Sequence, residues 1–397
     1  MKRKIIPIIV SSATMAISGQ SFAEINMNGF ATMVAGQSLT EDKELHGYDE
    51  KLRFEKGSNL GLQFSSDLGE GVTATAQLMT RGENDWSIEA EWAYISYEVN
   101  DSIKLIAGKQ RSPFYMYSDY VDVGYAYHWL TPPENVYALP FDSSNGISMI
   151  MSNYFGDLDS TLQVMFGRTQ KDGFSLSGND ADLDSYNSFT FNWTGVYDFA
   201  TFRLGHSMAK IDIGLAPMKQ IADGWQAYDD ASAFEADELI KQINVNEDPV
   251  SFSGLGLTLD FDTYFVVAEY TLLNLSESFI GKSQSYYISA GYRFDNFTAH
   301  VTYGGDSSTA NETIQEQLDE IDSTYAGAGV DAAYQGLKAG TEQLADAEAD
   351  STDISAGLRW DFHPATAFKF DLTQRTDNLL DEDNSALIYR AALTTVF

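Results

Sequence analysis

The sequence has no cysteine, few histidines and a shortage of basic residues. Its 397 residues include 5 His and 24 Lys and Arg against 58 Asp and Glu, so the formal net charge at pH 7 is −34. Without cysteine the chain forms no disulfide framework and no thiolate metal site. The shortage of Lys and Arg argues against nucleic acid as a partner, because phosphate contacts need clustered basic side chains.

Long apolar runs and enzyme motifs are also missing. Beyond the first two dozen residues, no apolar run approaches the roughly 20 residues of a membrane-spanning helix, which excludes an α-helical membrane protein. Neither a G-x-S-x-G nor an H-E-x-x-H motif occurs, and the five histidines lack the spacing of metal ligands. We therefore predict no enzyme, no metal site and no cofactor. Aromatic residues make up 13% of the chain, too many for a disordered acidic protein.

The first 23 residues have the three parts of a secretory signal. Basic residues at 2–4 precede an apolar segment from residue 5 to about 17, and Ser21 and Ala23 supply the small residues of a cleavage site. We predict that residues 1–23 are removed on export and that residues 24–397 form the mature domain.

The rest of the chain is dominated by runs in which apolar and polar residues alternate. Residues 354–362 are the clearest example, with Ile, Ala, Leu, Trp and Phe on one face and Ser, Gly, Arg and Asp on the other. A strand that crosses a membrane needs about 9–11 residues of this kind. Sixteen such runs are predicted, at approximately 25–37, 52–66, 71–82, 87–99, 103–112, 146–156, 160–170, 186–197, 199–212, 251–261, 263–274, 284–294, 297–305, 353–362, 365–376 and 386–397.

Connections between these runs alternate in length. Every second one is very short and rich in Asp, Asn and Gly, as at 67–70, 157–159 and 295–296, whereas the intervening ones are longer. This rhythm predicts an all-β fold, a 16-stranded antiparallel transmembrane β-barrel with short periplasmic turns and long extracellular loops. The strands of a soluble β-sandwich would also alternate between apolar and polar residues. Nothing in that fold, however, requires short and long connections to alternate along the chain.

The predicted inner face of the barrel carries many charged residues. In a dry core, burial of each unpaired charge would cost several kcal/mol of folding free energy. The interior is therefore predicted to hold water. The alternative is a plugged barrel in which these charges pair with one another. The basic residues assigned to the pore wall are Arg53, Arg81, Lys104, Arg203, Arg293, Arg359 and Arg390.

The third long loop, about residues 113–145, is predicted to fold inward and set the pore size. It is unusually aromatic for a solvated loop, and its acidic residues would face the basic wall and create a transverse field. A lid packed outside the barrel is the alternative. The acidic candidates are Asp119, Asp122, Glu134 and Asp142, and the aromatic candidates are Tyr115, Tyr120, Tyr125, Tyr127 and Trp129.

Three patches resemble the general porins of Gram-negative outer membranes. Residues 58–72 (SNLGLQ followed by DLGEGV) look like the hairpin of strands two and three, and residues 106–110 (IAGKQ) resemble the end of strand five. The C-terminal run that ends in Phe397 is similar to the assembly signal read by the outer-membrane insertion machinery. The resemblance implies a homotrimer in outer-membrane lipid that passes small hydrophilic solutes. Asn59 and the absence of a Pro-Glu-Phe-Gly stretch in the third loop depart from the family pattern.

Two further loops are strongly acidic. Residues 214–249 hold eight acidic and two basic residues, and residues 306–350 hold eleven acidic residues and one lysine. Short helices are predicted at about Phe234–Ile243 and Ile314–Ile321. We hypothesise a negative mouth and a preference for cations. A substrate-selective channel with an aromatic constriction, a loop-based adhesin or receptor, and an outer-membrane hydrolase are the alternative functions.

Overall fold

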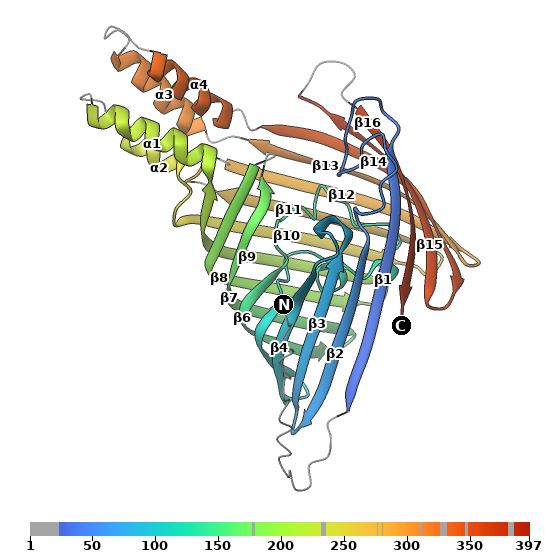
Figure 1. The fold of residues 1–397 in the computed structure, drawn as a ribbon. Coiled ribbons are helices and arrows are strands. Elements are labelled where there is room, and N and C mark those ends of the chain that lie inside the picture. The colour runs from blue at the N-terminus through green and yellow to red at the C-terminus, as the bar shows by residue number, and fades with distance from the viewer. Residues whose placement is uncertain are drawn as a thin grey trace, which may run out of the picture.

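Sixteen strands form one closed antiparallel barrel (Figure 1) in the computed structural model, which describes residues 24–397 except 177–178, 232–235, 276, 280, 310–311, 326–331, 346–347 and 380–384. The predicted fold class is therefore confirmed. The predicted signal peptide, residues 1–23, lies outside the described residues.

Every strand pairs with its neighbours in sequence, and β1 pairs with β16 to close the sheet. The strands are β1 (Ile25–Ser38), β2 (Asn59–Gly69), β3 (Val72–Arg81), β4 (Ile88–Asn100), β5 (Ile103–Arg111), β6 (Ser143–Phe155), β7 (Leu158–Leu176), β8 (Asn179–Tyr197), β9 (Ala200–Leu215), β10 (Asp248–Asp260), β11 (Tyr264–Leu275), β12 (Gly281–Phe294), β13 (Phe297–Thr309), β14 (Ala349–His363), β15 (Thr366–Asp377) and β16 (Ser385–Val396).

The two rims of the barrel differ, as the sequence predicts. One rim carries the start of β1, the C-terminal Phe397 and the tight turns, where Asp198, Asp262 and Asp295 adopt positive φ angles of 50°, 62° and 51°. Asp tolerates this left-handed conformation better than most residues, which explains its recurrence there. The last residue is tied to the first strand, because Phe397 and Gly29 exchange two backbone hydrogen bonds of 2.7 and 2.9 Å. All the longer connections lie at the opposite rim or inside the barrel.

The two faces of the sheet differ in polarity. Outward side chains are largely apolar and exposed, for example Ile147 at 61%, Val301 at 51% and Ile354 at 55%. Inward side chains are largely polar or charged. Because successive side chains in a strand point to opposite faces, this contrast is the direct structural expression of the alternating sequence.

Three predicted strand boundaries shift by six or seven residues. β7 continues to Leu176, and β8 already begins at Asn179. The two strands therefore extend into residues 171–185, which were predicted to form a loop, and pair there as a long hairpin. The second strand begins at Asn59 rather than near residue 52. Residues 52–58 turn back on β1, where Gly36 and Arg53 form an isolated bridge, and the Arg53 side chain pairs with Asp49.

Four helices gather at the long-loop rim, on one side of the barrel (Figure 1). They are α1 (Ala216–Ala231), α2 (Asp237–Ile243), α3 (Glu312–Tyr325) and α4 (Ala332–Ala345). Helical structure is confirmed where α2 and α3 were predicted, within the described residues, while α1 and α4 were not foreseen. Trp225 of α1 is fully buried and donates a 2.8 Å hydrogen bond to Thr341 of α4, which ties the two acidic loops together. Among the described helices, none combines the length and the apolar character needed to cross a membrane.

Candidate functional site: a constriction inside the barrel

The third loop, defined here as residues 112–142 between β5 and β6, folds into the barrel as predicted. It contains the single-turn helices η2 (Ser118–Tyr120) and η3 (Gly124–Ala126). Its side chains reach distant strands: Trp129 donates to Thr302 of β13 at 2.9 Å, and Asn135 donates to the carbonyl oxygen of Gly305 at 2.9 Å. A lid packed outside the barrel is thereby excluded.

Part of the predicted aromatic set fixes the loop to the wall, and of these residues Tyr127 also borders the space that remains in the lumen. Tyr115, Tyr127 and Trp129 are buried. The Trp129 ring packs edge-on against Tyr287 of β12 with ring centroids 5.4 Å apart, and Tyr115 packs in the same way against Phe252 of β10, also at 5.4 Å. Apolar burial of these rings supplies the main attraction between loop and wall.

Basic wall residues hold the loop through its backbone. Lys369 of β15 is fully buried, and its ammonium group donates to the carbonyl oxygens of Gly124, Tyr127 and Trp129. Arg359 of β14 donates to the carbonyl oxygens of Tyr125 and Tyr127 at 2.8 and 2.7 Å. Charge-assisted hydrogen bonds of this kind are stronger than neutral ones, so they fix the path of the loop around η3.

Two wall carboxylates hold the loop by accepting hydrogen bonds from its N–H and O–H groups. Glu269 of β11 accepts hydrogen bonds from the backbone N–H of Met116 and the hydroxyl of Tyr137, both at 2.7 Å. Asp371 of β15 accepts from the backbone N–H of Leu130 at 2.9 Å. Lys369, Glu269 and Asp371 were absent from the predicted site. Alternation places all three on the inner face, and that was the one available signal.

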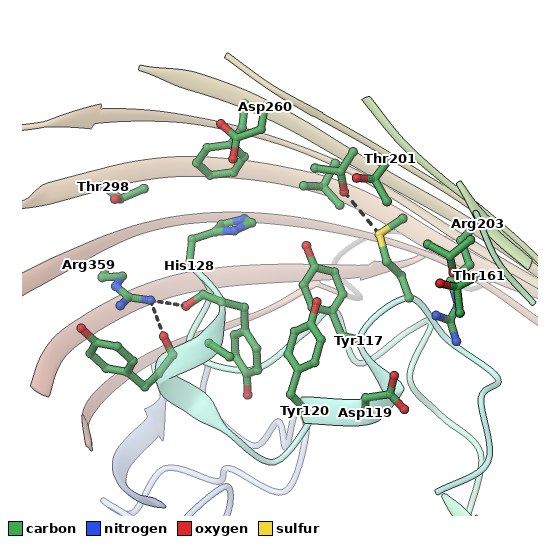
Figure 2. A pocket seen from close by; sticks show the side chains of 18 of the residues that line it. Tyr117, Asp119, Tyr120, His128, Thr161, Thr201, Arg203, Asp260, Thr298 and Arg359 are labelled. Carbon is green, nitrogen blue, oxygen red and sulfur yellow. Dashed lines mark hydrogen bonds between the residues drawn. The ribbon is translucent and has the colours of Figure 1, made fainter. Parts of the chain in front are cut away.

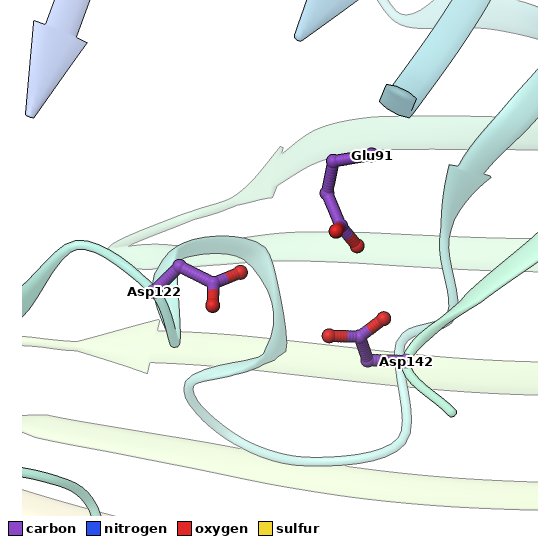
Figure 3. Close-up of side chains that lie close together, drawn as sticks. All are labelled: Glu91, Asp122 and Asp142. Atoms are coloured by element: carbon purple, nitrogen blue, oxygen red, sulfur yellow. The ribbon is translucent and has the colours of Figure 1, made fainter. Parts of the chain in front are cut away.

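An ion-pair cluster anchors the loop at Asp122 and at its last residue, Asp142; Figure 3 shows its three carboxylates. Arg81 of β3 contacts Glu91 of β4 at 3.0 Å and Asp122 of the loop at 3.1 Å, while Arg111 contacts both Asp122 and Asp142. Burial alone would raise the pKa of Asp122, but Arg111 and Arg81 outweigh it and lower that pKa. Asp122 is therefore a stable anion at neutral pH.

The same three carboxylates are close enough to be considered as metal ligands. One oxygen from each of Glu91, Asp122 and Asp142 lies within 4.8 Å of the others. The two guanidinium groups already contact these oxygens, and a divalent cation would have to displace them. The arrangement is suited to locking the loop in place rather than to holding a metal.

Glu134 is held at the far side of the barrel. It accepts a 2.6 Å hydrogen bond from Arg390 of β16 and lies 3.1 Å from His46. Burial works against its ionisation, but His46 and Arg390 together lower the pKa of Glu134 below its ordinary value. Of the four predicted constriction acids, Asp122, Glu134 and Asp142 thus contact wall arginines directly.

A cavity of about 890 Å³, referred to below as the passage, remains between the loop and the wall (Figure 2). Tyr117, Asp119, Tyr120, Tyr125 and His128 line it from the loop side. The wall contributes three apolar side chains, Ile150, Phe265 and Val267. Its other lining side chains carry hydroxyl, amide or charged groups, namely Thr161, Gln163, Asn192, Thr194, Thr201, Arg203, Thr258, Asp260, Arg293, Thr298, Arg359 and Asp361.

Positive and negative side chains are equal in number along this passage. Arg293 binds Asp260 through two hydrogen bonds of 2.7 and 2.9 Å, and Arg359 binds Asp361 at 2.7 Å. The other two charged groups of the lining are Asp119 and Arg203. Three carboxylates therefore face three guanidinium groups, and the passage itself has no strong preference of sign.

Two of the predicted wall residues neither line the passage nor bind the third loop. Arg53 is in the segment before β2, as described above, and Lys104 lies near the short-turn end of β5, 4.0 Å from Glu98. Arg203 and Arg293 line the passage, whereas Arg81 and Arg390 bind the third loop.

No protein-family model matches the sequence, and no curated protein is similar to it. Solved structures, in contrast, share its fold over nearly the whole chain. An OmpF of Salmonella typhi in complex with daunomycin superimposes with a TM-score of 0.57 at 15% identity and covers 94% of this chain and 98% of its own.

Two further structures agree. The outer-membrane channel DcaP of Acinetobacter baumannii has a TM-score of 0.54 at 12% identity, covering 94% of this chain and 97% of its own. An anion-selective porin from Comamonas acidovorans has a TM-score of 0.54 at 14% identity, covering 94% of this chain and 100% of its own. Together with the closed 16-stranded barrel and its inward third loop, these similarities show that the chain has the fold of Gram-negative outer-membrane porins.

Proposed function

We propose that the protein is a water-filled channel of the outer membrane through which small hydrophilic solutes and ions diffuse passively. The observation that carries this proposal is the passage beside the third loop, which is lined mainly by polar and charged side chains. Hydroxyl and amide groups at its surface can replace the water of a passing solute without binding it tightly.

The outer face of the barrel supports a membrane location. It presents exposed Ile, Leu, Val and Phe side chains, and water would disfavour so large an apolar surface. Export through the predicted signal peptide and assembly through a signal that ends in Phe397 complete this proposal. A homotrimer is proposed as well, and one solved structure with the same fold, an OmpT of Vibrio cholerae, is described as a trimer form.

A mild preference for cations is proposed, with its origin in the loops. Residues 214–249 and 306–350 carry a large excess of acidic side chains, and a negative vestibule concentrates cations before they reach the balanced passage. Such an effect fades with salt because the Debye length is about 8 Å at physiological ionic strength. The anion-selective porin with the same fold indicates that the fold alone does not determine the sign.

The aromatic lining favours a second candidate, a channel selective for one class of solute. Tyr117, Tyr120 and Tyr125 lie on the loop side of the passage, where a sugar or planar solute could stack. Saturable block of ion current by such a solute would support this candidate. Block that rises linearly with concentration would favour simple diffusion.

Swelling of vesicles that contain the purified protein tests the proposed function. We expect swelling in neutral sugars at rates that fall steeply with sugar size, because the passage is narrow. Protein-free vesicles in the same sugars are the control. Equal, slow swelling with and without protein would contradict the proposal.

A further inference from the structure

Six charged side chains line the passage, and four of them form the two ion pairs described above. The remaining two are Asp119 of η2 and Arg203 of β9. Neither of them forms an ion pair with a residue that the structure describes. The Arg203 guanidinium donates one hydrogen bond, of 3.3 Å from Nη2 to the carbonyl oxygen of Pro113, and its Nε has no partner in the described part of the chain. The passage therefore holds one carboxylate and one guanidinium group that no ion partner neutralises.

The wall next to Arg203 carries hydroxyl groups and glycine rather than acids. In the sheet register Arg203 lies opposite Thr194 of β8 and Gly256 of β10, and Thr161 of β7 lies opposite Thr194 in turn. Glu269 of β11 acts on Arg203 from beyond ion-pair distance, and its two oxygens already accept hydrogen bonds from the third loop and from β12. Arg203 is half-buried, so its positive charge is available to a solute in the passage.

Asp119 supplies the opposite charge from the third loop. It is exposed, and Figure 2 shows it with Arg203 at the end of the passage away from Arg359. Both charges act on the hydroxyl group of Tyr120. Burial raises the pKa of Tyr120, the Asp119 carboxylate raises it further, and the Arg203 guanidinium opposes the rise. One charge on the loop and one on the wall therefore act on the same part of the passage.

A solute with one positive and one negative group satisfies both of these side chains at once. A simple cation or anion pairs with one of them and is repelled by the other, and an uncharged solute pairs with neither. A guanidinium group binds a carboxylate through charge-assisted hydrogen bonds, and a carboxylate accepts such bonds from an ammonium group. The acidic loops add little to this discrimination, because they act on net charge and a zwitterion has none.

We propose that Asp119 and Arg203 select zwitterionic solutes of the amino-acid type, with the solute's ammonium group at Asp119 and its carboxylate at Arg203. Hydroxyl and amide side chains of β7 and β8 surround this part of the passage and replace the solute's remaining water. Both contacts are open to water, so they are weak and the solute leaves again, as conduction requires. This inference rests on the proposed function, because the solute has to pass through the channel.

Swelling of protein-containing vesicles in alanine and in lactamide tests the proposal, since lactamide is the uncharged isomer of alanine. The rates are corrected for protein-free vesicles, and their ratio removes differences in the number of channels. Asp119→Asn removes the exposed carboxylate, and Arg203→Gln removes the positive charge but keeps an N–H donor for Pro113. Asp157→Asn is the matched control, because it removes the same charge from an exposed turn between β6 and β7 that does not line the passage.

We expect the ratio of the alanine rate to the lactamide rate to fall about threefold in Asp119→Asn and in Arg203→Gln, and to keep its wild-type value in Asp157→Asn. A ratio that is unchanged in both passage variants, or that Asp157→Asn lowers equally, would overturn the proposal. Normal swelling in lactamide with an unchanged ratio contradicts the selection of zwitterions and leaves the channel in place. Swelling no faster than that of protein-free vesicles in either solute contradicts the channel, and this inference with it.

Discussion

The inner wall of the barrel has two sides that treat the third loop differently. Strands β14 to β16, together with β3 to β5, hold it by buried ionic contacts, as Lys369, Arg390 and Arg111 illustrate. Strands β8 to β10 border the passage, and they hold the loop mainly by aromatic packing and neutral hydrogen bonds, as Phe252 and Asn192 illustrate. The loop therefore crosses the lumen between a side where ion pairs fix it, called the fixed side, and a side where it faces the passage, called the open side.

The largest expected effect comes from removing the most buried contact on the fixed side. Lys369→Met keeps the length of the side chain but leaves the three loop carbonyl oxygens without their donor. We expect a loss of about 3 kcal/mol in unfolding free energy and a larger, noisier single-channel conductance as the loop loosens. Unchanged conductance and an unchanged denaturation midpoint in lipid would show that this contact does not position the loop.

A smaller effect is expected at the ion-pair cluster. Asp122→Asn keeps the shape of the side chain but removes the charge that faces Arg81 and Arg111, and charge-assisted hydrogen bonds contribute about 2 kcal/mol each. The variant should denature earlier, because two guanidinium groups become under-neutralised, and the added net positive charge in the barrel should weaken the cation preference that the acidic loops create. Denaturation curves and reversal potentials together measure this, and wild-type values for both would contradict it.

Asp119→Asn tests the open side of the loop, which faces the passage. Asp119 is exposed on the passage, so its removal should leave stability within about 0.5 kcal/mol of the wild type. The balanced passage would then carry one net positive charge, and the reversal potential should move toward anions. A strong loss of stability, or no change in selectivity, would place Asp119 outside the role assigned to it.

The smallest effect is a response to acid at Glu134. Its pKa lies below the ordinary value, so its ion pair with Arg390 stabilises the folded protein at pH values above the unfolded-state pKa of about 4.3. This contribution should be constant from pH 8 to 5 and disappear as the pH falls through the folded-state pKa. Glu134→Gln should be less stable at neutral pH and should lack that part of the acid transition. If the unfolding free energy of the wild type and that of Glu134→Gln fall with pH in the same way, the stabilising role of the Glu134–Arg390 ion pair is contradicted.

The barrel was predictable because its strands have one apolar and one polar face. An apolar outer face and a polar inner face leave a period of two in the sequence, and tight turns require residues such as Asp198 and Asp262. The inward fold of the third loop followed from its aromatic content. The role of its partners did not follow, because Lys369 lies more than two hundred residues away and only the closed barrel brings it to η3.

The helices at the rim show a different limit. α1 has an apolar period at Met218, Ala222 and Trp225 that was overlooked in the sequence, and its contact with α4 through Trp225 and Thr341 joins residues of two separate loops. An apolar cavity between the third loop and strands β7 to β11 was not predicted, because it needs residues of the loop and of five strands at once.

Conductance of the purified protein in a planar bilayer under a salt gradient decides whether the protein is a channel. We expect discrete conductance steps, with closures in threes if the trimer forms, and a reversal potential that favours cations and approaches zero as the salt concentration rises. A membrane that stays silent would contradict the channel, and a reversal potential that favours anions at low salt would contradict the role of the acidic loops.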